Sequence, residues 1–237
     1  MTSINRHQGA VLAALLVAAF MGQFDFFVVN VAAPAIQEAL SASQAGLELI
    51  VGGYAFAYAS GLIAGGRLGD MYGHRRMYLW GLMLFAATSL LCGVSGSAGF
   101  LIFASVVQGF AAAVMIPQVL AAINVVLPGE RRGWAMAWYG VATGVGSIAG
   151  QFLGGWFVHA DLMGLGWRAI FLVNAAFITL FYKELKLSTF DEENARLIGM
   201  ATGAIFYALM TLISLTTVAA FDAVGSILVI SFFIAPA

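Results

Sequence analysis

The chain of 237 residues is 62% hydrophobic and 9% charged, whereas a soluble domain carries about 25% charged residues. This composition excludes an ordinary soluble domain and indicates a membrane protein. The formal net charge of -1, with basic residues in short clusters, argues against nucleic-acid binding.

Apolar stretches of about 20 residues recur along the chain, and each is long enough to cross a hydrocarbon core of about 30 Å as a helix. The sequence therefore predicts an all-α membrane protein with about eight transmembrane helices. The predicted spans, in chain order, are 9–31, 48–66, 77–96, 100–126, 134–158, 168–182, 197–218 and 221–235. The first run is too long for a signal peptide, so we interpret it as a retained span.

The distribution of Lys and Arg predicts the orientation, because cytoplasmic loops retain these residues. If the spans alternate in direction, only Arg168 falls on one side. The other nine fall together: Arg6, Arg67, Arg75, Arg76, Arg131, Arg132, Lys183, Lys186 and Arg196. This bias places the N-terminus in the cytoplasm.

Asp25 is an acidic residue inside the first span. A carboxyl group in a bilayer is costly and by default marks an ion or proton path. Asp25 is therefore the candidate for proton coupling, with a capping or packing role near the outer interface as the alternative. Asn30, on the same span, is a candidate for lining a polar cavity.

The segment between the second and third spans, Gly66–Arg76, has glycines and charges at regular positions. Gly66 and Gly73 permit a tight turn in a cytoplasmic loop and a close approach of helices. Asp70 can cap a helix or pair with Arg75 or Arg76, which would form a latch on the inward side. A plain loop that only follows the positive-inside rule is the alternative.

Small and polar residues gather in the fourth and fifth spans. Gly146, Gly150, Gly154 and Gly155 allow close helix packing and a gating movement, with tight packing alone as the alternative. Four amides are candidates for a polar cavity, and hydrogen bonding between helices is the equally open alternative. These amides are Gln108, Gln118, Asn124 and Gln151.

A faint repeat predicts the domain organisation. The pairs Gly65–Gly66 and Gly154–Gly155 end the second and fifth spans, and Pro34 and Pro117 recur at a similar spacing in the first and fourth spans. We expect two inverted three-helix units in residues 1–182, a polar cytoplasmic linker over 183–196, and two further helices over 197–237. Chance similarity between glycine-rich helices is the alternative for the repeat.

Two of these segments resemble a known family. Gly66–Arg76 resembles the major facilitator superfamily signature Gly-x-Leu-Ala-Asp-x-x-Gly-Arg-Arg/Lys, with Gly69 in place of alanine. Phe24–Pro34 resembles the Leu-Asp-x-Thr-Val-Val-Asn-Val-Ala-Leu-Pro stretch of the fourteen-helix drug:H⁺ antiporter branch, with Phe27 in place of threonine.

Later spans extend the resemblance. Gly146–Gly155 is similar to the antiporter signature Gly-x-x-x-Gly-Pro-x-x-Gly-Gly, with Gln151 at the proline. Ala104–Ala113 is similar to Ala-Arg-x-x-Gln-Gly-x-Gly-Ala-Ala, with Ser105 at the arginine that the family assigns to proton coupling. Trp167–Asn174 resembles the stretch that opens the sixth helix, where a packing role is the alternative for Asn174.

The resemblance implies a secondary active transporter that exports small amphipathic or drug-like compounds against proton entry, in a bacterial cytoplasmic membrane. Its implied partners are a small-molecule substrate, protons and the lipid bilayer, with no cofactor, metal or enzymatic activity. Such transporters have two six-helix halves, so we expect a second half or another copy to complete this chain. The alternative is a membrane fragment or scaffold that transports nothing without a partner chain.

Overall fold

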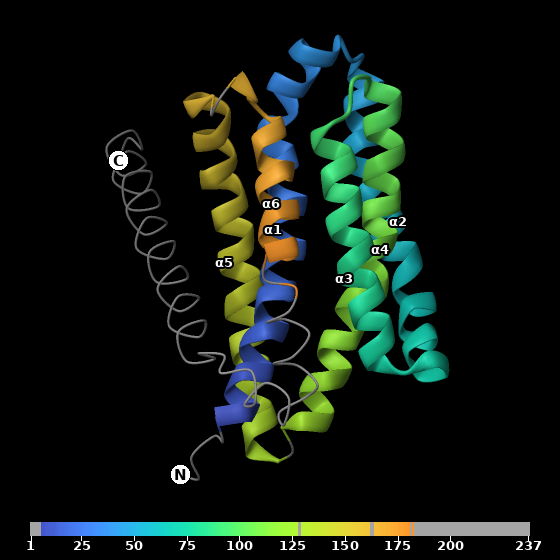
Figure 1. The fold of residues 1–237 in the computed structure, drawn as a ribbon, viewed down its shortest axis with the longest axis vertical. Coiled ribbons are helices and arrows are strands. Elements are labelled where there is room, and N and C mark those ends of the chain that lie inside the picture. Colours follow the sequence, from blue (N-terminus) through green and yellow to red (C-terminus); the bar gives the residue numbers. More distant parts are fainter. Residues whose placement is uncertain (1–5, 128, 162–163, 181, 183–237) are drawn as a thin grey trace, which may run out of the picture.

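The computed structural model describes residues 6–127, 129–161, 164–180 and 182, and within these residues the regular structure is helical. The helices stand side by side along the long axis of the molecule (Figure 1). They are α1 (Arg6–Leu40), α2 (Gln44–Tyr72), α3 (His74–Gly93), α4 (Ala98–Val126), α5 (Glu130–Ala160) and α6 (Arg168–Leu180). This arrangement confirms the predicted all-α class. The predicted linker 183–196 and the spans 197–218 and 221–235 lie outside the described residues.

Most helices are longer than the spans that hydropathy predicts. The helices α2 and α4 each contain 29 residues, which extend about 44 Å at a rise of 1.5 Å per residue. That length matches a bilayer of about 40–45 Å including its headgroup regions. Hydropathy detects only the apolar middle of such a helix, so the predicted boundaries were too narrow.

The predicted loop at Gly66–Arg76 is wrong for most of its length. Helix α2 continues to Tyr72 and α3 begins at His74. Gly73 alone makes the turn, with φ 91°, a conformation that favours glycine. Its N–H donates to the carbonyl of Gly69 at 2.9 Å, so the helical hydrogen-bond pattern persists through the charged segment.

Serine caps start two of the helices at the opposite end of the bundle. The hydroxyl of Ser43 accepts a hydrogen bond from the N–H of Gly46 at 3.1 Å, and that of Ser97 accepts from the N–H of Phe100 at 3.3 Å. Each cap satisfies a backbone donor that a helix N-terminus leaves unpaired. These caps start α2 and α4 directly after the short connections that follow α1 and α3.

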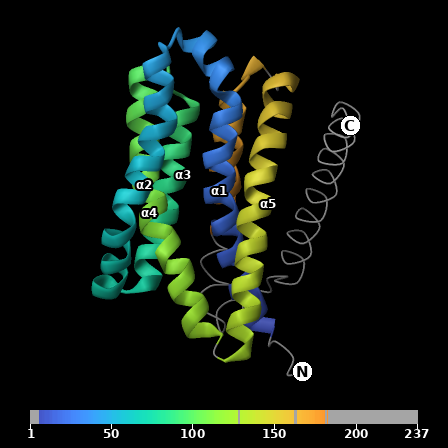
Figure 2. The same cartoon turned by 180° about the vertical axis from the view of Figure 1, so that it is seen from behind.

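The helices form two groups. In both views α2, α3 and α4 stand together, and α5 and α6 stand beside α1 (Figures 1 and 2). The most extensive contacts are between α2 and α4 and between α1 and α5, and α6 also packs against α3. Each of the two main contacts therefore joins one helix from the first half of the described chain to one from the second.

Glycines bring both main pairs of helices into backbone contact. A Cβ atom at Gly65 would collide with the carbonyl oxygen of Ala113 on α4. On the other side, a Cβ at Gly146 or Gly150 would lie 2.6 Å from the carbonyl oxygen of Phe20 or Phe24 on α1. Glycine is required at these positions because any side chain would push the helices apart.

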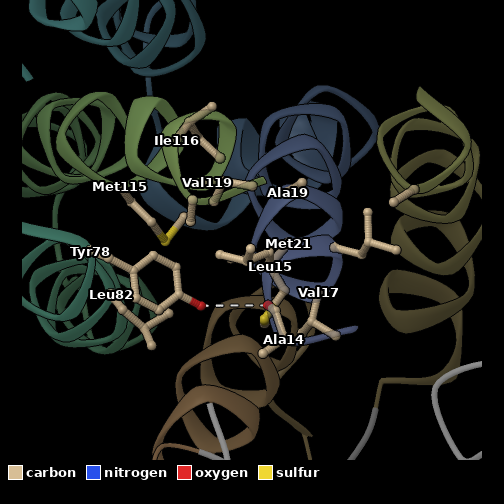
Figure 3. Packing of buried hydrophobic residues seen from close by; sticks show 14 of the residues in the cluster. Ala14, Leu15, Val17, Ala19, Met21, Tyr78, Leu82, Met115, Ile116 and Val119 are labelled. Atoms are coloured by element: carbon tan, nitrogen blue, oxygen red, sulfur yellow. Dashed lines mark hydrogen bonds between the residues drawn. The ribbon is translucent and has the colours of Figure 1, made fainter. Parts of the chain in front are cut away.

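The buried side chains form two apolar clusters stacked along the bundle. One contains Leu15 and Met21 of α1 together with Tyr78 and Leu82 of α3 and Met115 of α4. There the Tyr78 hydroxyl donates to the carbonyl of Ala14 at 3.5 Å, which joins α3 to α1 (Figure 3). The second cluster lies further along the same helices and includes Val28 and Ile36 of α1, Leu101 of α4 and Phe171 of α6.

The outer surface exposes many large apolar side chains. Phe56 is 74% exposed and Ile63 is 83% exposed, and both lie on α2. Monomeric soluble proteins seldom expose such large apolar side chains in long stretches. Five of the described helices, α1 to α5, are long and apolar enough to cross a membrane, and α6 is a shorter apolar helix of 13 residues. The surface fits a lipid environment.

Candidate functional site

Asp25 lies near the middle of α1 and is completely buried. Its Oδ1 accepts a hydrogen bond from Nδ2 of Asn174 on α6 at 2.8 Å. The two residues are 149 positions apart in the chain, so only the folded bundle brings them together. The structure places Asp25 inside the bundle rather than at a helix end.

A second set of polar side chains lies beside this pair. Nε2 of Gln108 donates to the hydroxyl of Ser89 at 2.7 Å, and Oε1 of Gln108 accepts a weak hydrogen bond from Sγ of Cys92 at 3.5 Å. We call the group of Asp25, Asn174, Gln108, Ser89 and Cys92 the midspan cluster.

The midspan cluster forms a polar layer between the two apolar clusters. On α1, Asp25 lies between Met21 of one apolar cluster and Val28 of the other. Gln108 of α4 and Asn174 of α6 occupy the corresponding positions on their helices. Four helices therefore each contribute a polar residue at the same depth, which explains how these residues meet.

The midspan cluster leaves two oxygen atoms without a hydrogen-bond donor. Among the side chains that the structure describes, Oδ2 of Asp25 and Oδ1 of Asn174 are buried and have no hydrogen-bond partner. Nε1 of Trp167, outside this cluster, is a third such atom. An unpaired buried polar atom costs about 1–3 kcal/mol. Such a cost at the buried acidic residue of the described bundle makes Asp25 a candidate for a functional residue.

A small cavity adjoins Asp25. It has about 10 Å³ of water-accessible volume, which is close to what one water molecule requires. Its polar lining comes from Asp25, Tyr54, Ser105 and Gln108. Its apolar lining consists of Phe26, Val29, Ile50 and Val51. The cavity therefore gives the carboxyl group room for a water molecule between α1, α2 and α4.

Aromatic rings lead away from this cavity along α2. The ring of Phe26 lies 5.8 Å from that of Tyr54, and the ring of Tyr54 lies 6.4 Å from that of Tyr58. The hydroxyl of Tyr54 also donates to the carbonyl of Gly22 at 3.4 Å. These rings form an apolar, polarisable wall next to the acidic residue.

The other predicted cavity residues lie apart from Asp25. Asn30, Asn124 and Gln151 are exposed. The side chains of Asn30 and Gln151 donate to backbone carbonyls of their own helices, at 2.8 Å and 3.4 Å. Gln118 is buried at the α2–α3 junction. Of the five predicted amides, the structure brings only Gln108 to the cavity beside Asp25.

At the α2–α3 junction, the amide of Gln118 is bonded at both of its ends. Nε2 of Gln118 donates to the carbonyl of Gly65 at 2.8 Å, and Oε1 of Gln118 lies 2.8 Å from Nδ1 of His74. Because Nε2 of Gln118 faces carbonyls, its Oε1 is the acceptor and Nδ1 of His74 carries the proton. We call the group of Gly65, Asp70, His74 and Gln118 the junction cluster.

Asp70 lies at the edge of the junction cluster. Its Oδ1 is 3.8 Å from Nε2 of His74, and its side chain is 61% exposed. Arg75 and Arg76 are exposed at the start of α3, and pairing of Asp70 with either arginine stays a prediction. Gly66 is loosely packed, because a Cβ there would meet only Cβ of Pro117 at 4.0 Å.

The predicted glycines of the fifth helix pack against α1. Gly146, Gly150 and Gly154 all lie within close contact of α1, whereas a Cβ at Gly155 would lie 3.8 Å from Val31. Close packing explains the first three. Whether α5 also moves against α1 stays a prediction.

Sequence reasoning missed several of the residues described above. It gave Asn174 no partner and kept a packing role as its alternative, and it did not single out Tyr54 or His74. Tyr54 and Asn174 are polar residues within apolar stretches, which is a detectable signal. Their partners depend on helix packing, which no local pattern contains.

A bundle of long apolar helices with a buried acid at mid-depth is typical of a membrane transporter. Residues 15–183 match the profile described as Major Facilitator Superfamily, which is more than half of the chain. The chain belongs to this superfamily and is an integral, multi-pass membrane protein. Residues 150–237 also match the profile described as ABC 3 transport family. That stretch is less than half of the chain and lies mostly outside the described residues, so it does not show membership of the second family.

Curated relatives carry names of antibiotic and drug exporters. The probable actinorhodin transporter of Streptomyces coelicolor is 41% identical over 70% of this chain and 28% of its own length. The tetracenomycin C resistance and export protein of Streptomyces glaucescens is 37% identical over 69% of this chain and 30% of its own length. The multidrug resistance protein Stp of Mycobacterium tuberculosis is 34% identical over 87% of this chain and 40% of its own length. The chain thus spans less than half of these relatives.

Solved structures share the fold. A bacterial homologue of the human lysosomal transporter Spinster, inward-facing and unoccupied, has a TM-score of 0.71 at 23% identity, covering 79% of this chain and 44% of that one. A bacterial homologue of the human drug peptide transporters PepT1 and PepT2 has a TM-score of 0.63 at 18% identity, covering 98% of this chain and 56% of that one. At these identities the likeness concerns the fold alone.

Proposed function

We propose that the chain works in a secondary active transporter that exports small amphipathic or drug-like compounds in exchange for protons. The observation that carries this proposal is the buried carboxyl group of Asp25 beside a small cavity, with Oδ2 unpaired. An ionisable group at this depth is expensive and is retained for ion or proton movement. The printed names of the relatives, which concern antibiotic and multidrug export, support the same substrate class.

In this proposal Asp25 exchanges the proton and the rings of Phe26, Tyr54 and Tyr58 favour an aromatic or apolar substrate. A cationic group on the substrate would gain from the unprotonated carboxylate and from the ring faces. Substrate and proton would then compete for one carboxyl group, which is the simplest basis of exchange.

The junction cluster and the glycine contacts would support the conformational change. Asp70, Arg75 and Arg76 would latch the inward side, and Gly150 and Gly154 would let α5 slide on α1. We also propose two inverted three-helix units, because α1 packs on α5 as α4 packs on α2. The linker 183–196 and two further helices over 197–237 remain part of the proposed organisation.

We place the N-terminus in the cytoplasm of a bacterial cell. Arg67, Arg75 and Arg76 lie near the α2–α3 junction, and Arg131 and Arg132 lie at the start of α5. The α2–α3 junction and the start of α5 lie toward one end of the bundle, and the start of α6, where Arg168 is, lies toward the other (Figure 1). The end rich in arginine faces the cytoplasm under the positive-inside rule.

The relatives are more than twice as long as their matched parts, so transport by the whole unit requires a second half or another copy of this chain. The competing proposal is a membrane fragment or scaffold that transports nothing without a partner chain. The chain covers 28% and 30% of the length of two of these relatives. A direct assay of the chain separates the two.

The test is substrate-driven proton movement in proteoliposomes that contain the full 237-residue chain. Ethidium serves as the cationic amphiphilic substrate, and a trapped pH-sensitive dye reports protons. We expect an ethidium gradient to drive proton flux in the wild type and Asp25→Asn to abolish it. Flux in the Asp25→Asn variant equal to wild type would contradict the role of Asp25, and absence of flux in the wild type would favour the scaffold.

Asp161→Asn is the matched control. Asp161 is an exposed acid after α5 whose Oδ1 accepts a hydrogen bond from the N–H of Gly166 at 2.7 Å. Its backbone has φ 40°, which asparagine tolerates. The same chemical change at this site should leave the flux at the wild-type value.

A further inference from the structure

Asn174 and Asp25 form one hydrogen bond, although an amide and a carboxylic acid can form two with each other. A primary amide has one oxygen acceptor and two N–H donors, and a carboxylic acid has one acceptor and one O–H donor. Nδ2 of Asn174 already donates to Oδ1 of Asp25 at 2.8 Å. The remaining atoms of the two groups are Oδ1 of Asn174 and Oδ2 of Asp25, and both are buried without a donor.

One proton would satisfy both atoms. When Asp25 is ionised, Oδ2 and Oδ1 of Asn174 are two acceptors that cannot bond to each other. When a proton forms an O–H bond at Oδ2, that O–H can donate to Oδ1 of Asn174 once rotation of the side chains brings the two oxygens within reach. The acid and the amide are then joined by two hydrogen bonds, and release of the proton to water restores the single bond.

The other polar groups near Asp25 are neutral, and Asn174 is the one with a buried acceptor oxygen that has no donor among the described residues. The titratable groups that face Asp25 are Tyr54 of α2, which lines the same cavity, and Cys92 of α3, which bonds to Gln108. Neither ordinarily carries a charge at neutral pH. From α4, Gln108 donates to Ser89 at 2.7 Å and is a second amide neighbour of Asp25, and Ser105 is a neutral hydroxyl. Helix α5 presents glycines, Gly146 and Gly150, to this part of α1.

We propose that Asn174 is the positioning residue of the proton site, which rests on the proposed function of Asp25. Asn174 holds Oδ1 of Asp25 in both states and supplies the acceptor for the proton on Oδ2. Protonation thereby adds a hydrogen bond between α1 and α6, and deprotonation removes it.

The position of α6 makes this bond mechanically relevant. Helix α6 packs against α3 as well as lying beside α1 (Figure 1). A Cβ at Gly93 of α3 would lie 2.8 Å from Leu172 of α6, so these two helices are closely packed. A proton on Asp25 would therefore tighten the connection between the group containing α1 and the group containing α3.

The experiment is infrared difference spectroscopy of the full chain in lipid nanodiscs as the pH is changed. A band from a protonated carboxyl group that is lost in Asp25→Asn belongs to Asp25. We expect this band to move to higher wavenumber in Asn174→Leu, because its C=O and O–H groups lose hydrogen bonds. Asn174→Gln keeps the amide and should return the band toward its wild-type position.

The matched control is Thr179→Val on the same helix. The hydroxyl of Thr179 donates to the carbonyl of Ala175 at 2.6 Å within α6, so its loss should leave the band in place. If Asn174→Leu does not fold, Asn174→Ser removes the amide with a smaller side chain and should shift the band in the same direction.

Two outcomes would overturn the proposal, and they differ in meaning. An Asp25 band that stays in place in the folded Asn174 variants removes the role of Asn174 and leaves Asp25 as the proton site. The absence of any band that depends on both pH and Asp25 shows that Asp25 does not exchange a proton, and then both proposals fail.

Discussion

The midspan cluster and the junction cluster both join several helices through side-chain amides, but they differ in how completely their atoms are paired. In the midspan cluster, Oδ2 of Asp25 and Oδ1 of Asn174 are buried and have no donor. In the junction cluster, Gln118 uses both ends of its amide, bonding to Gly65 and to His74. The first cluster is completely buried around Asp25, whereas Asp70 of the second is largely exposed.

This difference separates chemistry from architecture. A paired amide network stabilises the packing of helices and has no atom left for a ligand. A buried acid with an unpaired oxygen is costly and changes its bonding when a proton arrives. We therefore expect substitutions in the junction cluster to affect stability first, and substitutions in the midspan cluster to affect proton-linked behaviour first.

The largest loss of stability should come from Gly65→Ala. The added Cβ would collide with the carbonyl oxygen of Ala113, so α2 and α4 must separate, and the carbonyl of Gly65 would lose its bond from Gln118. We expect a destabilisation of about 3 kcal/mol, the upper end for overpacking. Thermal unfolding in detergent, followed by tryptophan fluorescence, measures it.

Gly66→Ala is the matched control for this prediction. A Cβ at Gly66 has an ordinary contact with Pro117, and alanine is the better helix former by about 1 kcal/mol. The control should be as stable as the wild type or more so. Equal stability of the two variants would show that α2 and α4 do not depend on backbone contact at Gly65.

A smaller loss should follow from Gln118→Leu. The substitution leaves the carbonyl of buried Gly65 without its donor, which costs about 1–3 kcal/mol, whereas the side chain of His74 is 39% exposed and can bond to water instead. We expect a total near 2 kcal/mol in the same unfolding assay. Gln151→Leu is the control, because it removes an exposed amide that bonds only weakly to its own helix, at 3.4 Å, and it should be nearly neutral. Equal losses of stability in the two variants would show that the bonds of Gln118 do not stabilise the junction cluster.

The smallest effect on stability should come from Asp70→Asn. Nε2 of His74 is 3.8 Å from Oδ1 of Asp70 and the carboxyl side chain is largely exposed, so the contact contributes below about 1 kcal/mol. A loss of several kcal/mol would show that the contact between Asp70 and His74, rather than Gln118, holds the α2–α3 junction. A transport defect without a stability loss would support the proposed latch.

The sequence predicted the class of fold because the length of an apolar stretch is a local property. It also selected Asp25 as the proton-coupling candidate and Gln108 as a cavity-lining candidate, since an acid or amide inside an apolar helix is costly wherever its neighbours lie. It could not assign Asn174 to Asp25, because that contact joins residues 149 apart through the packing of α6 on α1 and α3.

Rotation about a helix axis explains a second miss. Gly65 and Gly66 are adjacent, and a pattern of small residues favours both equally. Only the way α2 faces α4 decides that Gly65 makes the backbone contact and Gly66 does not. The helical form of residues 66–72 was missed for a related reason, because hydropathy follows the membrane core and not the hydrogen bonds that continue beyond it.

The central claim is that Asp25 exchanges a proton with substrate, and proton release on substrate binding tests it most directly. The full chain in weakly buffered detergent solution would be mixed with ethidium, and a pH-sensitive dye would count the protons released. We predict release of roughly one proton per bound ethidium in the wild type and in Asp161→Asn, and none in Asp25→Asn. The same release from Asp25→Asn, at equal ethidium binding, would contradict the account.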